Sequence, residues 1–340
     1  MAQRAEVRGQ RVLIALDAMG GDHAPAEIIA GALLARAELK IDIALVGAKE
    51  VIEAELARQG ALPSAFEIIH ASEAISMHEH PAQAVRTKRD ASINIAMGMV
   101  KRGVAGAFVS AGNTGAVMAS ALMTLGRIQG IERPALGTVA PFSEMGILVL
   151  DIGANADVKP NYLVQFAQMG SVYAERVMGV KNPRVALLNI GAEDTKGTEL
   201  IQDVYARLGK AGVNFVGNIE GGEIHKNKAD VIVTDGFTGN VAVKLTEGVA
   251  DFLFRELRTA FTSKLQYKIA ALVLKPGLLK LRDRMDPGTY GGVPLLGVNG
   301  VVMIAHGNSD ARAIKNALRF AHDAASSGML DSIRAHSQRK

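Results

Sequence analysis

The feature that most constrains this chain is a regular alternation between short apolar runs and longer segments with apolar residues at helical spacing. The short runs predict strands at 12–17, 41–47, 66–70, 105–110, 147–151, 184–190, 213–217, 229–235 and 301–306. The longer segments predict helices at 25–39, 48–59, 92–101, 114–125, 161–178, 197–208, 239–261 and 310–325. Strands that alternate with helices predict an α/β fold, in which helices cover both faces of a mostly parallel sheet.

Length and composition set the limits of this fold and exclude some chemistry. A chain of 340 residues suits one large α/β domain or two modest lobes. Cysteine is absent, which excludes disulfides, thiolate metal sites and an acyl-cysteine intermediate. The polar, basic start at 1–11 predicts no signal peptide, and no uncharged run approaches the ~18 residues of a membrane span. We therefore expect a soluble or peripheral protein in a reducing cytoplasm.

Glycine and small polar residues follow five of the predicted strands. Since ligands of open α/β sheets bind beyond the carboxyl ends of the strands, these turns are candidate binding sites. Where a turn leads straight into a helix, its free backbone N–H groups and the helix dipole favour an anion. Turns of this kind commonly carry Gly, Asn and Asp for conformational reasons alone. Five of them at one sheet edge nevertheless favour a shared polar cleft. The residues selected from them are Asp17, Gly20, Gly21, Asn113, Thr114, Gly115, Asn155, Lys196, Asp235, Thr238 and Asn240.

The familiar nucleotide motifs are absent. No two glycines are separated by a single residue, which excludes G-x-G-x-x-G, and no glycine precedes Lys-Ser or Lys-Thr. The anion is therefore expected to be neither a Rossmann dinucleotide nor a P-loop nucleotide.

Several motifs, in order and spacing, resemble the PlsX family of phosphate acyltransferases. They are LDAMGGDHAP at 16–25, SAGNTGA at 110–116, GRIQGIERPAL at 126–136, LDIGAN at 150–155, LLNIGAEDTKG at 187–197, DGFTGNVAVK at 235–244 and AHGNSD at 305–310. The resemblance spans nearly the whole chain and implies a single domain over 1–340. It implies a three-layer α/β/α sandwich related to phosphotransacetylases and to isocitrate and isopropylmalate dehydrogenases.

The resemblance also implies a reaction. Enzymes of this family move a fatty acyl group from acyl carrier protein (ACP) to inorganic phosphate, and the acyl phosphate feeds phospholipid synthesis. They form homodimers and associate peripherally with the inner face of the cell membrane. We expect no cofactor and no nucleic-acid partner.

Four residues are our candidates for catalytic roles: Lys196, His23, Asp22 and Asn240. Lys196 lies between a strand end and a helix start, where the lysine and the helix N-terminus would act on the same phosphate. An exposed loop lysine without a functional role is an equally good interpretation. His23 would donate to the oxyanion or protonate the leaving thiolate. Asp22 would otherwise be a helix N-cap.

Further substrate-binding candidates complete the set. Arg86 and Lys88 would bind phosphate or belong to a solvated helix face. Asn113 and Thr114 would bind phosphate or the carbonyl oxygen, or else cap a helix. Lys244 lies one helical turn after Asn240, so both can face one site. His78, Glu79 and His80 are neighbours that do not converge, and we predict no metal site.

One segment carries the positive charge of the chain. Residues 264–286 contain six lysines and arginines against two aspartates, a net charge of +4 that equals the net charge of the whole chain. The pattern predicts a basic amphipathic hairpin of two short helices broken at Pro276-Gly277. Such a hairpin would contact an anionic membrane through 265–285, bind acidic ACP, or pack as an ordinary helix pair.

Three other readings remain open. A phosphotransacetylase acting on acyl-CoA would use the same chemistry with a different thiol carrier. An oxidoreductase fits the fold class without the dinucleotide fingerprint. A non-catalytic membrane scaffold would bind lipid without phosphate-dependent turnover.

Overall fold

The structure, a computed structural model, describes residues 12–143, 145–285 and 287–338, and they form two compact units. Unit 1 contains the residues up to 126 together with 298–334, and unit 2 contains 127–297 together with the residues after 334. The basic start of the chain at 1–11 and Asp286, the last residue of the charged segment, lie outside the described residues. The single domain over 1–340 stays a prediction.

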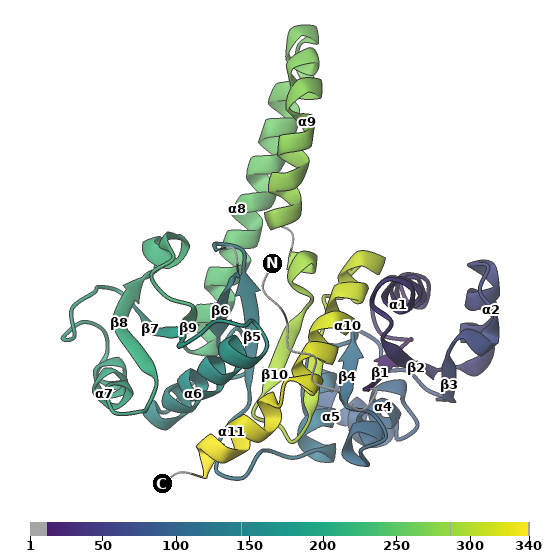
Figure 1. Cartoon of the computed structure of the whole chain (residues 1–340), viewed down its shortest axis with the longest axis horizontal. Helices are drawn as coiled ribbons and strands as arrows, with labels where there is room; N and C mark the ends of the chain where they lie inside the picture. Colours follow the sequence, from purple (N-terminus) through teal and green to yellow (C-terminus); the bar gives the residue numbers. More distant parts are fainter. Residues whose placement is uncertain (1–11, 144, 286, 339–340) are drawn as a thin grey trace. The chain divides into compact units, whose positions relative to one another are not determined.

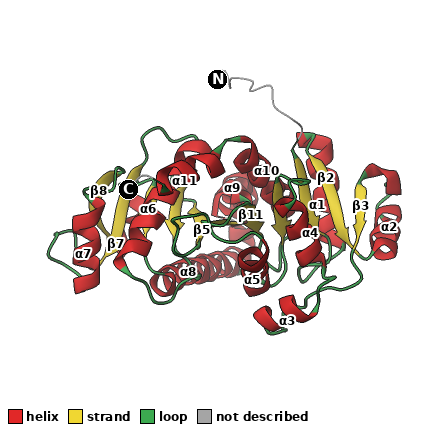
Figure 2. Cartoon of the chain, turned by 90° about the horizontal axis from the view of Figure 1, so that it is seen from below, coloured by secondary structure: helices red, strands yellow, loops and turns green. Residues whose placement is uncertain are grey.

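Unit 1 is a parallel sheet covered by helices on both faces (Figures 1 and 2). Its strands run in the order β3-β2-β1-β4-β11, with bounds β1 (Leu13–Asp17), β2 (Asp42–Gly47), β3 (Glu67–His70), β4 (Ala107–Ser110) and β11 (Val301–Ile304). Its helices are α1 (Ala26–Leu39), α2 (Lys49–Arg58), α3 (Pro81–Thr87), α4 (Ser92–Lys101), α5 (Thr114–Thr124) and α10 (Ala311–Ser326), with a short 3-10 turn at Pro63–Ala65. Helices α1 and α10 pack together over one face, and α4 and α5 cover the other.

Unit 2 has a mixed sheet in the order β10-β5-β6-β9-β7-β8. The bounds are β5 (Ala135–Ala140), β6 (Ile147–Leu150), β7 (Arg184–Asn189), β8 (Asn214–Glu220), β9 (Val231–Val233) and β10 (Val293–Leu296). Strands β6, β9, β7 and β8 are parallel, whereas β5 is antiparallel to both β6 and β10. The helices are α6 (Pro160–Arg176), α7 (Glu199–Leu208), α8 (Gly236–Thr262) and α9 (Leu265–Met285), with 3-10 turns η2 (Gly221–Lys226) and η3 (Pro287–Tyr290), and α11 (Met329–Ser337) follows near the chain end.

The central strands are apolar on both faces because helices cover both. In unit 1, Ile14, Ala15 and Leu16 of β1 have no exposed surface, and in unit 2 the same holds for Val231, Ile232 and Val233 of β9. Burying one such Val, Leu or Ile side chain contributes about 1.5–3 kcal/mol. The alternation that predicted an α/β fold is thus confirmed, and every predicted strand and helix before the charged segment is present with shifted ends.

The charged segment differs from its prediction. Residues Leu265–Met285 form one continuous helix, α9, which contains Pro276 in its interior. The predicted break at Pro276-Gly277 is therefore wrong, and the turn of the hairpin lies instead at 263–264, between α8 and α9 (Figure 1). An interior proline costs a helix about 3 kcal/mol, and packing of α9 along α8 offsets that cost. No helix of the described residues combines the length and the apolar character that a membrane span requires.

Candidate functional site

A buried aspartate organises the carboxyl edge of the unit 1 sheet. Asp17 ends β1 and has no exposed surface. Its carboxylate accepts hydrogen bonds from the Ser110 hydroxyl at 2.7 Å and from the Met19 N–H at 3.1 Å. Burial raises the pKa of the Asp17 carboxyl, and hydrogen bonds from Ser92 and Ser110 act in the opposite direction. Asp17 therefore holds the turn that follows it, and its contact with substrate stays a prediction.

The first turn also depends on Gly20. A Cβ atom at Gly20 would lie 2.8 Å from the backbone nitrogen of Gly112, closer than real Cβ atoms approach. Glycine at this position lets the turn after β1 lie directly against the turn after β4. Gly21 follows with φ of +116°, a conformation that side chains disfavour.

The next two residues of this turn, Asp22 and His23, have exposed side chains. The Asp22 N–H donates to the Gly307 carbonyl at 2.7 Å. Helix α1 begins at Ala26, and Pro25 is its N-cap residue without a side-chain cap. The reading of Asp22 as an N-cap is therefore wrong, because the helix begins too late for that carboxylate to reach its first amides.

Asn113 caps α5. Its Oδ1 accepts from the Ala116 N–H at 3.1 Å, and its Nδ2 donates to the Met77 carbonyl at 3.1 Å. Thr114 is exposed in the first turn of the same helix. Gly115 lies against Pro81, where a Cβ would stand 2.7 Å from the Pro81 Cγ. The capping alternative for Asn113 is confirmed, and binding of phosphate or carbonyl oxygen by Asn113 and Thr114 stays a prediction.

Lys88 has an ion-pair partner within unit 1. Its Nζ lies 2.8 Å from Glu79 and also donates to the Ala74 carbonyl at 2.9 Å. The Lys88 ammonium lowers the pKa of the Glu79 carboxyl. Arg86 is exposed in the last turn of α3. Within the described ranges, no group of three or more His, Asp or Glu side chains is arranged to hold a metal ion.

A second buried aspartate organises the edge of the unit 2 sheet. Asp151 follows β6 and has no exposed surface. Its Oδ1 accepts from the backbone N–H groups of Leu136, Gly153 and Ala154 at 3.0–3.2 Å. Its Oδ2 accepts from the backbone and side chain of Asn155 at 2.7 and 2.8 Å. Burial raises the pKa of the Asp151 carboxyl, and these hydrogen bonds oppose the change.

Asn155 belongs to the same network, because its Nδ2 also donates to the Pro134 carbonyl at 2.8 Å. The start of α8 packs on this turn: a Cβ at Gly236 would lie 2.7 Å from the Asn155 carbonyl oxygen. Asn155 is only 9% exposed, so its place in the structure is that of a support for the N-terminus of α8.

Four predicted residues lie in the first turns of α8. Asp235 is the N-cap residue, and its two oxygens accept from the Thr238 N–H at 2.8 Å and from the Thr238 hydroxyl at 2.7 Å. Asn240 donates to the Ile152 carbonyl at 3.1 Å. Lys244 forms an ion pair with Glu247 at 2.8 Å and is largely exposed. Asn240 and Lys244 lie one helical turn apart on α8, as predicted. Neither residue lines the pocket that is found at this edge of the unit 2 sheet.

That pocket opens where β7 and β9 end and where α7 and α8 begin, and its volume is about 910 Å³. We call it the site pocket. Thr198 and Asp235 line it, and each caps the helix that follows it. Ile190 and Phe237 also line it and are 81% and 66% exposed. Sequence reasoning missed Ile190, Phe237 and Val241 because it read the turns for polar groups only, and it missed Thr198 because it began the helix at 197. An apolar residue directly after a strand end was the available signal.

Lys196 lies beside the site pocket in the loop after β7. A Cβ at Gly191 would lie 2.8 Å from the Lys196 Cγ, so the aliphatic part of the side chain covers Gly191. The next residue, Gly197, lines the pocket. Helix α7 begins at Glu199 rather than at the predicted 197, and the Thr198 hydroxyl accepts from the Ile201 N–H at 3.3 Å. Lys196 is exposed and forms no ion pair with another described residue, so its ammonium is available to an anion.

The predicted residues thus fall into two groups. The turns at 17–23, 86–88 and 113–115 belong to unit 1, and Asn155, Lys196 and the α8 residues belong to unit 2. The structure brings the turns after β1 and β4 together in unit 1, and Asn155 and the start of α8 together in unit 2. The single cleft shared by all of them stays a prediction.

Solved structures define the fold class. The chain is similar to a phosphotransacetylase from Streptococcus pyogenes, with a TM-score of 0.61 and 16% identity over 93% of this chain and 94% of that one. It is also similar to 4-hydroxythreonine-4-phosphate dehydrogenase from Klebsiella pneumoniae, with a TM-score of 0.55 and 14% identity over 93% and 100% of the two chains. The fold is therefore the α/β fold of phosphotransacetylases and dehydrogenase-like proteins, as predicted.

The family follows from sequence. A family model described as "Fatty acid synthesis protein" matches residues 12–332. A phosphate acyltransferase from Desulfitobacterium hafniense (strain DSM 10664 / DCB-2) is 52% identical over 322 residues, which cover 94% of this chain and 96% of that protein. A phosphate acyltransferase from Heliobacterium modesticaldum is 51% identical over 95% of this chain and 97% of that protein. The chain belongs to this fatty acid synthesis family, the PlsX family, and it is an acyltransferase.

Proposed function

We propose that this enzyme transfers a fatty acyl group from acyl-ACP to inorganic phosphate and so supplies acyl phosphate for phospholipid synthesis. The observation that carries the proposal is the identity of 52% to the Desulfitobacterium hafniense phosphate acyltransferase over 94% of the chain. The choice of ACP as the thiol carrier rests on the family resemblance of the motifs.

The geometry of the site pocket suits both inorganic phosphate and the acyl chain of the thioester. Helices α7 and α8 begin at its rim, and their first N–H groups favour an anion such as phosphate. Exposed Ile190 and Phe237 offer an apolar wall to an acyl chain. Lys196 adds a positive charge beside the same rim.

The reaction needs positioning more than a strong base. A large fraction of inorganic phosphate is dianionic near neutral pH, although its second pKa lies above the value of about 6 found for phosphate monoesters. One phosphate oxygen attacks the thioester carbonyl carbon, the tetrahedral oxyanion collapses, and the carbon–sulfur bond breaks. The electron pair leaves with the sulfur, whose thiol has a pKa of about 8.5, and a proton completes the thiol. We assign Lys196 to the phosphate and His23 to that proton, with Asp22 and Asn240 as further catalytic candidates.

Thiol release from acyl-ACP, measured with and without inorganic phosphate, tests the proposal. We expect release that requires phosphate and yields acyl phosphate in equal amount. Release from acyl-CoA but not from acyl-ACP would favour the phosphotransacetylase reading. Absence of release from either thioester would contradict the proposed function and leave the scaffold and oxidoreductase readings.

The α8–α9 hairpin carries the second part of the proposal. Ile269, Leu272 and Val273 of α9 are 58%, 69% and 77% exposed, beside the basic residues Lys268 and Lys275. Exposed apolar side chains with neighbouring lysines suit an anionic membrane surface. We propose that the enzyme is a cytoplasmic homodimer that touches the inner face of the cell membrane through 265–285. A monomeric mass in solution would contradict the dimer.

Charge reversal on this hairpin should weaken membrane binding. Each lysine near an anionic surface contributes about 1 kcal/mol, and the introduced glutamates add repulsion, so the double variant Lys268→Glu/Lys275→Glu should bind phosphatidylglycerol vesicles at least ~30-fold less tightly. Lys181→Glu, at an exposed position of unit 2 outside the hairpin, is the matched control. Flotation of the double variant with vesicles at wild-type levels would exclude this segment as the contact.

A further inference from the structure

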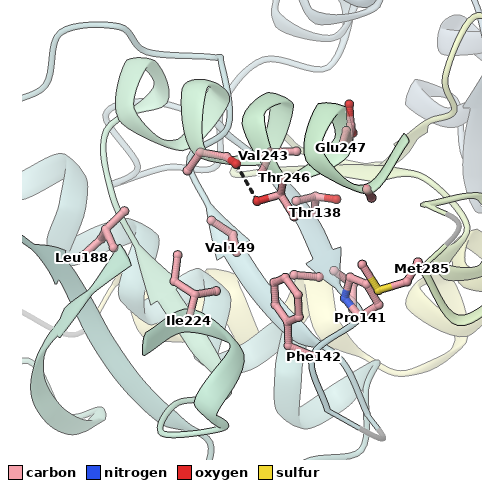
Figure 3. Close-up of a pocket in the computed structure, with 14 residues that line it drawn as sticks. Thr138, Pro141, Phe142, Val149, Leu188, Ile224, Val243, Thr246, Glu247 and Met285 are labelled. Carbon is pink, nitrogen blue, oxygen red and sulfur yellow. Dashed lines mark hydrogen bonds between the residues drawn. The ribbon is translucent and has the colours of Figure 1, made fainter. Parts of the chain in front are cut away.

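Helix α8 leaves space between itself and the sheet of unit 2. Of its described residues only Gly236 and Gly239 are buried, so the helix is closely packed only at its first turn. Beyond that turn, a cavity of about 70 Å³ lies between α8 and strands β5 and β6. Figure 3 shows Leu188 and Ile224 at one side of this cavity and Pro141 and Met285 at the other. We call it the α8 cavity.

The α8 cavity adjoins the site pocket. Leu188, Ile224 and Ala242 line both. From Ala242 the cavity follows α8 as far as Ala250, eight residues or about 12 Å along the helix axis. The three shared residues therefore place the α8 cavity directly beside the site pocket.

The walls of the α8 cavity suit a hydrocarbon. Val139, Phe142 and Val149 line it from the sheet side. Its polar side chains are largely engaged elsewhere: the Thr246 hydroxyl donates to the Ala242 carbonyl at 2.8 Å, and Glu247 pairs with Lys244. A cavity with these walls favours methylene groups over a polar ligand.

We infer that the acyl chain of the substrate runs from the site pocket into the α8 cavity, and that the far end of the cavity limits chain length. The inference rests on the proposed function, because it assigns a place to the substrate of that reaction. The cavity as it stands holds only the methyl end of a chain, and Met285, a flexible side chain at the far side, is the residue able to yield. Ala250 and Met285 are therefore specificity-determining residues.

Chain-length profiles test this inference. Ala250→Leu fills the far end of the α8 cavity and should lower kcat/KM for stearoyl-ACP at least tenfold, because each methylene displaced from an apolar site costs about fourfold. The same variant should act on octanoyl-ACP as the wild type does. Ala206→Leu, on the exposed side of α7 and outside both cavities, is the matched control and should leave the profile unchanged.

A second variant tests the chain-length inference independently of Ala250→Leu. Met285→Ala enlarges the same end and should shift the preference toward longer chains. An unchanged profile in folded Ala250→Leu and Met285→Ala, with an active wild type, would overturn the inference and leave the proposed function intact. A wild type without activity on any acyl-ACP would instead contradict the proposed function itself.

Discussion

Lys196→Ala should lower kcat/KM for inorganic phosphate about a hundredfold and leave the fold intact. Removing one group that stabilises developing negative charge costs about 10²–10³ in rate. Lys196 is exposed beside the site pocket and holds no ion pair among the described residues, so its loss creates no unpaired buried charge. The measurement is the phosphate dependence of thiol release from acyl-ACP.

The control for this substitution is Lys210→Ala, an exposed lysine of unit 2 outside the site pocket, which should behave as the wild type. Lys196→Arg should retain part of the activity, since it keeps the charge but changes its geometry. Unaltered phosphate dependence in Lys196→Ala would move the anion site to other residues while leaving the reaction class in place.

Gly239→Ala should destabilise unit 2 by about 3 kcal/mol and abolish activity with it. A Cβ at Gly239 would overlap the Asp151 carbonyl oxygen and lie 2.9 Å from the Thr234 Cγ2. Neither neighbour can move freely, because Asp151 is fixed by its hydrogen bonds and Thr234 is buried. Overpacking of a rigid contact costs about 1–3 kcal/mol, and here the contact also positions the N-terminus of α8.

Gly248→Ala is the matched substitution on the same helix. No other side chain or distant backbone atom lies within 4 Å of a Cβ there. The alanine should therefore stabilise α8 by roughly 0.5–1 kcal/mol through its higher helix propensity. Urea unfolding of the two variants measures both effects, and equal stability of the two would refute the close packing of Gly239.

The alternation of strand and helix patterns was enough to predict most of the fold. The strands that it missed are β5 and β10, which form an antiparallel pair. Gly137 lies inside β5 and Pro294 inside β10, and both residues are disfavoured in strands. Contacts with neighbouring elements outweigh these local preferences, and a pattern within one segment does not contain that information. The interior Pro276 of α9 misled the prediction for the same reason.

The turns after the strands were predictable in location, whereas the contacts of their residues were not. Strand ends correctly indicated the turns, but Asn113 and Asp235 turned out to cap helices, and Lys88 pairs with Glu79. Capping and catalysis use the same residue types at the same helix starts, so sequence alone does not separate them. The apolar lining at Phe237 went unnoticed because only the polar residues at strand ends were considered as candidates.

The two buried aspartates, Asp17 and Asp151, have a consequence for how function is assigned from motifs. Asp17 ends β1, Asp151 follows β6, and each accepts hydrogen bonds from the turn that comes next. The aspartates of the motifs LDAMGGDHAP and LDIGAN thus determine the shape of a loop. A chain that kept both motifs but lost Lys196 would retain the architecture without the proposed anion site. Under the proposed function, retained activity is marked by exposed residues such as Lys196 and His23 rather than by the two buried aspartates.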